Sequence, residues 1–168
     1  MVFQVIVPRQ LRGFGAGRQR LEFIYQAPST FRQVNRPEWL SSLKSEAGFA
    51  KVSGLELTLL DCARYFHKAA GINGLAQIVK DLGGQAKPNV LASIAAHYEN
   101  SSVRRLGYLF QLAGHLQQAE ALRPFARKAK TSALLDPSIR PLPKELPRLH
   151  DKAPGWRLII NERLEVAF

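Results

Sequence analysis

The sequence of 168 residues contains a single cysteine, Cys62. One cysteine cannot form an intrachain disulfide, and it excludes zinc or iron–sulfur sites that are built from several cysteines. The sequence also has no run of about 18 apolar residues, which a membrane-spanning helix needs. Its opening segment is too short and too alternating for a signal peptide. We therefore expect a cytoplasmic protein with no membrane partner.

Patterns typical of catalysis or metal binding are missing as well. The four histidines are scattered, without paired spacing and without an HExxH motif. Glu56 and Asp61 are nearly half a turn apart on a helix and do not form a carboxylate pair. Cys62 falls on an apolar stripe, where burial keeps a thiol protonated. The sequence predicts a protein that is not an enzyme and that uses no cofactor or metal.

Acidic residues are few. Lys and Arg number 24 against 13 Asp and Glu, which gives a formal net charge of +11. Such an excess favours polyanionic partners. Residues 1–50 hold seven basic and three acidic residues and residues 101–168 hold twelve and six, whereas the middle is almost balanced. This distribution is compatible with a fold in which the two basic ends of the sequence form one basic face.

The composition is that of a globular protein, with 46% hydrophobic and 22% charged residues. A chain of this length removes about 70% of its extended surface from water on folding, so a sizeable core is available. We expect a single domain over residues 1–168. Its class is α+β, with a mixed or antiparallel sheet and a central helical segment.

Strand patterns occupy both ends of the chain. Alternation and β-branched residues predict strands over 3–7, 20–25 and 49–52, and the mixed polarity of 28–48 predicts mainly a loop, with one helical turn at 39–43. Near the other end, strands are expected over the ranges 131–135, 156–160 and 163–166. The prolines between 137 and 154 predict an extended arm.

Helical patterns fill the middle. Ser53 and Glu56 have the spacing of a capping box, in which Glu56 reaches back to the Ser53 amide, so a helix is expected to begin there and to end at Gly71. Pro124 removes an amide donor and should interrupt the last helix. The further helices are expected over residues 75–82, 88–98, 101–114 and 116–129.

Two groups of basic residues are candidates for phosphate binding. The first surrounds the glycine-containing connection 13–17, which lacks GxGxxG spacing and leads into a strand pattern, so we expect a flexible or hairpin connection. Its arginines either hold phosphate oxygens through charge-assisted hydrogen bonds or form a solvated basic loop. They are Arg9, Arg12, Arg18 and Arg20.

The second group lies on the predicted helices. Arg104 and Arg105 fall in a first helical turn, where free amides also favour anions; the alternative is a pair of solvated arginines. A further basic ridge follows helix 116–129 with spacings of three to four residues; the alternative is a run that only keeps the protein soluble. This ridge consists of Arg123, Arg127, Lys128 and Lys130.

Two motifs in the middle carry a family resemblance. The run 53–61, Ser-Gly-Leu-Glu-Leu-Thr-Leu-Leu-Asp, is similar to a Thr/Ser-x-Pro-Glu-Arg-Thr-Leu-Leu-Asp signature, with Leu55 replacing its Pro and Leu57 its Arg. The run 100–109, Asn-Ser-Ser-Val-Arg-Arg-Leu-Gly-Tyr-Leu, resembles a second segment of the same family. Leu135-Asp136-Pro137, Trp156 and Asn161 resemble its closing strands. The family is that of the AbiEi antitoxins of type IV (abortive infection) toxin–antitoxin systems.

The resemblance covers about residues 1–165 and implies the C-terminal domain of an AbiEi-type antitoxin and transcriptional regulator. In that family a winged helix-turn-helix precedes this region and binds operator DNA. The region itself contributes to autoregulation and to neutralising a nucleotidyltransferase-like toxin in phage defence. The residues before Phe3 are too few to encode this winged domain, so we expect either that the chain is only the later domain or that the natural protein has lost or separated its DNA reader. The Leu at position 57 puts any role of the family's Arg in doubt.

The sequence therefore predicts a noncatalytic antitoxin and regulatory domain. Its expected partners are promoter DNA, contacted through basic residues, and a nucleotidyltransferase-like toxin that is a functional partner whether or not the two proteins touch. The alternative is a small basic RNA-binding or translation-associated protein, although the sequence has neither an aromatic RNP-like pattern nor a GXXG loop.

Overall fold

A computed structural model describes residues 1–68, 70–139 and 151–168. Contacts within the chain divide it into two compact units, Met1–Val52 and Ser53–Phe168. We call them the sheet unit and the helical unit, and each is described by itself. The organisation as one domain over 1–168 stays a prediction.

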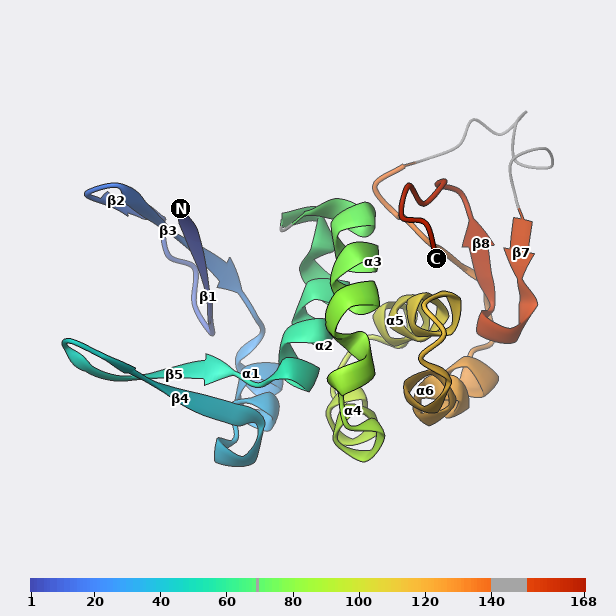
Figure 1. Cartoon of the computed structure of the whole chain (residues 1–168), viewed down its shortest axis with the longest axis horizontal. Helices are drawn as coiled ribbons and strands as arrows, with labels where there is room; N and C mark the ends of the chain where they lie inside the picture. The colour runs from blue at the N-terminus through green and yellow to red at the C-terminus, as the bar shows by residue number, and fades with distance from the viewer. Residues whose placement is uncertain (69, 140–150) are drawn as a thin grey trace. The chain divides into compact units, whose positions relative to one another are not determined.

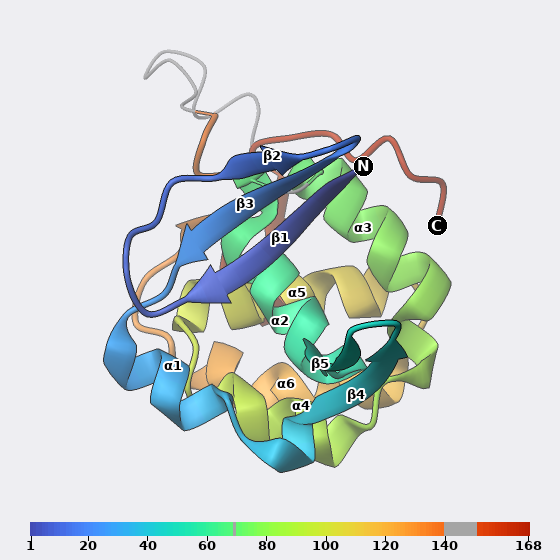
Figure 2. The ribbon, with the colours of Figure 1, turned by 90° about the vertical axis from the view of Figure 1, so that its left-hand side faces the viewer.

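The sheet unit is built on a three-stranded mixed sheet with the order β1-β3-β2 (Figure 2). β1 and β3 are parallel, with Val2 opposite Arg20 and Val7 opposite Tyr25, and β2 is antiparallel to β3. A second pair of strands, β4 and β5, forms a separate hairpin. The elements are β1 (Val2–Val7), β2 (Phe14–Ala16), β3 (Gln19–Tyr25), α1 (Pro28–Val34), η1 (Pro37–Trp39), β4 (Leu40–Ser45) and β5 (Gly48–Ser53).

The strands predicted over 3–7, 20–25 and 49–52 are confirmed. The glycine-containing connection is a hairpin, because β2 folds back on β3 and Gly17 takes the positive φ (59°) that the tight turn requires. The loop predicted over 28–48 is wrong in two places. Pro28 sits in the first turn of α1, where its missing amide costs nothing, and the predicted helical turn at 39–43 is strand β4, which pairs with β5.

The helical unit packs its helices around α5 (Figure 1). α5 contacts α2, α3 and α6, and Ser102–Gly107 are all buried. A helix that is enclosed on most sides in this way is the centre of a core. The helices are α2 (Leu55–Tyr65), η2 (Phe66–Lys68), α3 (Gly71–Leu82), η3 (Gly83–Gln85), α4 (Pro88–Ala95), α5 (Asn100–Leu112) and α6 (Leu116–Lys128).

The start of α2 differs from the predicted capping box. Gly54 is the N-cap, no side chain caps the helix, and Glu56 does not reach back to Ser53. Glu56 Oε1 instead accepts a hydrogen bond of 2.7 Å from the backbone amide of Lys87, the residue that precedes α4. The same side chain that suits a capping box therefore caps a different helix, because α2 and α4 pack together.

The interruption predicted at Pro124 is wrong, since α6 runs without a break from Leu116 to Lys128. Proline removes one intrahelical hydrogen bond, and packing offsets that loss. Ala119, Leu122 and Ala126 form a buried stripe at helical spacing. Tertiary contacts of this face therefore hold α6 together through the proline.

A short mixed sheet follows α6, with the order β6-β8-β7. Its strands are β6 (Ala133–Leu134), β7 (Asp151–Ala153) and β8 (Leu158–Ile160), with η4 (Pro154–Trp156) between the last two. The strand predicted over 163–166 is wrong, because this segment is irregular. The proline-rich arm falls largely on 140–150, outside the described residues. Asn161 anchors the sheet, since its amide donates to the carbonyl oxygens of Asp136 (2.7 Å) and Ile139 (2.8 Å).

Gly107 allows the indole ring of Trp156, the last residue of η4, to lie against the backbone of α5. A Cβ atom at position 107 would lie 2.2 Å from the Trp156 ring, closer than real contacts. Trp156 is buried. The glycine is therefore required by the close approach of a side chain to the helix backbone.

The predicted α+β class with a mixed sheet is confirmed. Among the described residues, no helix combines the length and the apolar character that crossing a membrane requires.

A half-buried carboxylate joins α2 to the turn that follows α4. Tyr98 Oη donates a hydrogen bond of 2.6 Å to Asp61 Oδ1. Burial raises the pKa of Asp61 to about 6, against the opposing effects of the Tyr98 hydrogen bond and the positive charge of Arg64. The pKa of the neighbouring Cys62 thiol is also raised, by burial first and by the charge of Asp61 second.

The raised pKa of Asp61 predicts a fall in stability as pH rises. Between the ordinary value, near 4, and about 6 the folded state binds more protons than the unfolded state. The free energy of unfolding should therefore drop by about 2–3 kcal/mol across this window from this group. Asp61→Asn keeps an acceptor for Tyr98 and should remove this fall in urea titrations at several pH values. Asp81→Asn, which removes an exposed carboxylate of α3, is the control, and an unchanged slope in Asp61→Asn would contradict the assignment.

Candidate nucleic-acid interface

Four of the predicted arginines belong to the sheet unit. All have exposed side chains, and Arg20 pairs with Glu22 at 3.3 Å in a solvent-exposed ion pair that contributes little to stability. Two precede β2, one lies in the β2–β3 turn and one lies in β3, so a single three-stranded sheet carries them. They are Arg9, Arg12, Arg18 and Arg20.

Arg104 and Arg105 are buried, whereas binding to a phosphate requires an exposed side chain. Their exposed fractions are only 4% and 7%, and both guanidinium groups are occupied by backbone carbonyls. Arg104 Nη1 donates to the carbonyl oxygens of Thr131 (3.0 Å) and Arg157 (2.8 Å), and Arg105 Nε donates to that of Leu134 (3.0 Å). We therefore leave this pair out of the candidate interface, because α5 turns them inward to the C-terminal sheet.

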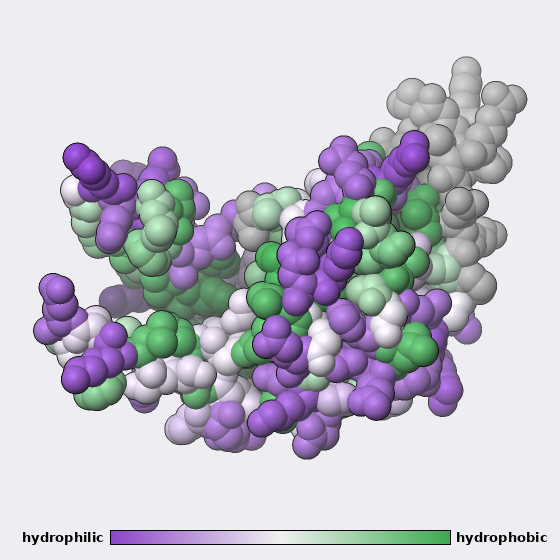
Figure 3. Space-filling view, in the orientation of Figure 1, coloured by the Kyte–Doolittle hydropathy of each residue, from purple (hydrophilic) through white to green (hydrophobic). Residues whose placement is uncertain are grey.

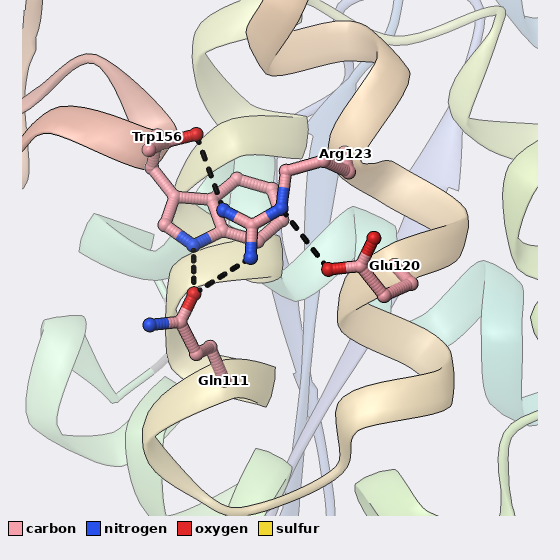
Figure 4. Close-up of polar contacts among 5 residues, drawn as sticks. Gln111, Glu120, Arg123 and Trp156 are labelled. Atoms are coloured by element: carbon pink, nitrogen blue, oxygen red, sulfur yellow. Dashed lines mark hydrogen bonds and ion pairs between the residues drawn. The ribbon is translucent and has the colours of Figure 1, made fainter.

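Arg123 is also committed to internal contacts (Figure 4). Its guanidinium carbon lies 4.2 Å from the centre of the Trp156 ring, within the range of a cation–π interaction. Its nitrogens donate to Glu120 (3.3 Å), to the carbonyl oxygen of Gly155 (3.2 Å) and to Gln111 Oε1 (2.9 Å). The indole nitrogen of Trp156 donates to the same Gln111 oxygen at 2.7 Å. This arginine therefore fixes Trp156 between α5 and α6.

The rest of the predicted ridge is exposed. Arg127, Lys128 and Lys130 lie at and just beyond the C-terminal end of α6, where positive charge is favoured by the helix dipole. Sequence reasoning missed a fourth cation, Arg157, which is exposed and precedes β8. Its backbone lies beside the segment that follows α6, because Arg104 binds the carbonyl oxygens of both Thr131 and Arg157. No local sequence pattern predicts that Arg157 lies close to the segment after α6.

The hairpin of β4 and β5 exposes apolar side chains that sequence analysis did not single out. Phe49 and Leu43 are 76% and 57% exposed. Figure 3 shows hydrophobic surface over this hairpin between hydrophilic regions. Within the described ranges, no cluster of three or more His, Cys, Asp or Glu side chains is arranged to hold a metal ion.

The chain thus presents two groups of exposed cations, one on each unit. Guanidinium and ammonium groups bind phosphate oxygens through charge-assisted hydrogen bonds, and such contacts position a nucleic acid without reading its bases. That the two groups form one face stays a prediction.

Comparison with known proteins identifies one family. The family model described as "AbiEi antitoxin C-terminal domain" matches residues 1–112, from the first strand to the end of α5. No curated protein and no solved structure matches the chain. The residues near 135–161 that resemble the closing strands of this family lie beyond the range that the family model matches.

The buried position of Arg105 predicts a structural role. The amides of Ala133 and Leu135 donate to the carbonyl oxygens of Arg157 and Ile159, so the Leu134 carbonyl points to the other side of β6, where Arg105 is its partner. Arg105→Met should lower the free energy of unfolding by about 1.5–3 kcal/mol, because that carbonyl loses a charged donor. Urea denaturation measures this loss. Arg127→Met removes an exposed arginine of α6 and should stay within about 0.5 kcal/mol of the unchanged protein; equal stability of the two variants would contradict the role.

Proposed function

Because the chain belongs to the AbiEi antitoxin C-terminal domain family, we propose that it is a noncatalytic antitoxin and regulatory domain of a type IV toxin–antitoxin system in the cytoplasm. It counteracts a nucleotidyltransferase-like toxin in abortive infection, a form of phage defence. It also assists binding to promoter DNA through exposed basic residues. The family match over residues 1–112 is the observation that carries the antitoxin role.

The DNA contact is supported by the side chains that remain exposed. Seven of the ten predicted residues are on the surface. In this proposal they contact phosphates, so they strengthen binding without specifying a DNA sequence. The sequence-reading part of the regulator would then be supplied by another segment or protein. The seven residues are Arg9, Arg12, Arg18, Arg20, Arg127, Lys128 and Lys130.

The proposed phosphate contacts predict a steep salt dependence. If the chain contacts roughly 6 to 10 phosphates of a promoter duplex, its affinity should fall by about 10³ to 10⁵ between about 50 and 200 mM salt. Arg9→Gln with Arg12→Gln should reduce the slope of log K against log salt by about 2. Fluorescence anisotropy measures both quantities.

The matched control for this pair lies on the same unit. Lys44→Gln with Lys51→Gln removes the same charge from the β4–β5 hairpin and should leave the slope near that of the unchanged chain. Salt-insensitive binding, or an equal effect of both pairs, would contradict the proposed interface. Tighter binding to RNA than to promoter DNA would favour a small RNA-binding protein instead.

The antitoxin role predicts rescue of growth. Expression of a nucleotidyltransferase gene adjacent to the gene for this chain should arrest cell growth, and co-expression of this chain should restore it. Colony counts with and without induction measure the effect. Gly107→Val forces a clash with Trp156, and this unfolded control should not rescue. Continued growth arrest with the unchanged, folded chain would refute the role.

A further inference from the structure

Arg157 has an unusual backbone conformation. It is the non-glycine residue of the described chain with a positive φ, at 49°. This left-handed region suits glycine and asparagine, whereas a long side chain is strained there. Strained residues persist only where their surroundings hold them, and they gather at functional sites.

Backbone contacts hold Arg157 in place. Its carbonyl oxygen accepts hydrogen bonds from Arg104 Nη1 (2.8 Å) and from the Ala133 amide (3.0 Å). Both bonds use the backbone, so any residue at position 157 would make them. The Arg157 side chain is exposed and makes no hydrogen bond or ion pair with the described residues. Among the residues that the structure describes, the arginine side chain therefore makes no polar contact that stabilises the fold, and asparagine would adopt this backbone with less strain.

In the part of the chain that the structure describes, Arg157 adds to the positive charge around Arg104. The pKa of the buried Arg104 guanidinium is lowered, by desolvation first and by the charge of Arg157 second. The pKa of Arg105 is also lowered, by burial first and by the charge of Arg104 second, and Glu99 and Asp136 partly offset this effect. Within the described ranges, neither Arg157 nor the nearby Lys128 and Lys130 is in an ion pair.

The same Arg104 nitrogen connects the two parts of this cluster. It donates to the carbonyl oxygens of Thr131 and Arg157 at once, so position 157 lies beside the segment that leaves α6. Lys128 ends α6 and Lys130 directly precedes Thr131. The buried guanidinium thus brings the backbone of Arg157 beside the segment that carries Lys130, and Lys128 lies two residues before Lys130 at the end of α6. Exposed positive charges on such neighbouring segments attract anions.

We propose that Arg157, with Lys128 and Lys130, binds the phosphate groups of a nucleic-acid backbone. The helical unit then has a phosphate-binding site of its own, and the strained arginine contributes to binding at a cost in stability. This inference rests on the proposed contact with nucleic acid and adds a residue that the sequence did not indicate.

The variant Arg157→Asn separates binding from folding. Asparagine tolerates the left-handed conformation, so the melting temperature should rise by about 2–4 °C. At the same time, binding to a short fluorescein-labelled DNA duplex of arbitrary sequence should weaken about fivefold to tenfold, and the slope against log salt should fall by about 1. Arg157→Lys keeps the charge and the strain and should preserve both the slope and the melting temperature. An RNA duplex of the same sequence shows which phosphate source is preferred.

Arg163→Asn is the matched control, because it removes an exposed arginine from the same unit. It should leave the affinity within about twofold of the unchanged chain. If Arg157→Asn binds as tightly as the unchanged chain, or if Arg163→Asn weakens binding equally, the site at Arg157 is refuted while the proposed function stands. If the unchanged chain binds neither duplex, the proposed nucleic-acid contact fails and this inference fails with it.

Discussion

Two buried guanidinium groups hold the C-terminal sheet against the central helix of this protein. The strands β6, β7 and β8 are only two or three residues long, so they cannot satisfy all of their own backbone groups. Arg104 and Arg105 supply donors to three carbonyl oxygens of this region. Long side chains with several donors suit this task, because α5 lies too deep for water to replace them.

Three other polar residues of the two family motifs likewise bond to distant parts of the chain. Glu56 caps the start of α4, Asp61 accepts a hydrogen bond from Tyr98, and Asn100 donates to the carbonyl oxygen of Phe125 in α6. Each side chain belongs to α2 or α5 and bonds to a different element. These motifs therefore describe how the helical unit is assembled, and recognition must come from residues that the assembly leaves exposed.

Part of the positive charge of the chain is used to assemble the fold. Arg104, Arg105 and Arg123 are used internally, the last of them to fix Trp156 over Gly107. The other predicted cations are exposed, and they lie on the β1-β3-β2 sheet with its loop and turn and around the end of α6. A basic composition is thus partly a structural requirement of α5 and α6, and only the remainder is available for a polyanionic partner.

The sequence by itself determined the α+β class, the strands over 3–7, 20–25 and 49–52, the helical middle and the family, because periodicity and short motifs are local signals. It could not determine which arginines are exposed. Arg104 and Arg127 are both arginines of predicted helices, yet Arg104 is buried and bound to carbonyl oxygens, whereas Arg127 faces solvent. It also misassigned Glu56 and Pro124, where packing between helices overrode the local rule. The left-handed backbone of Arg157 was decided by tertiary structure alone, since hydrogen bonds from residues distant in sequence hold it.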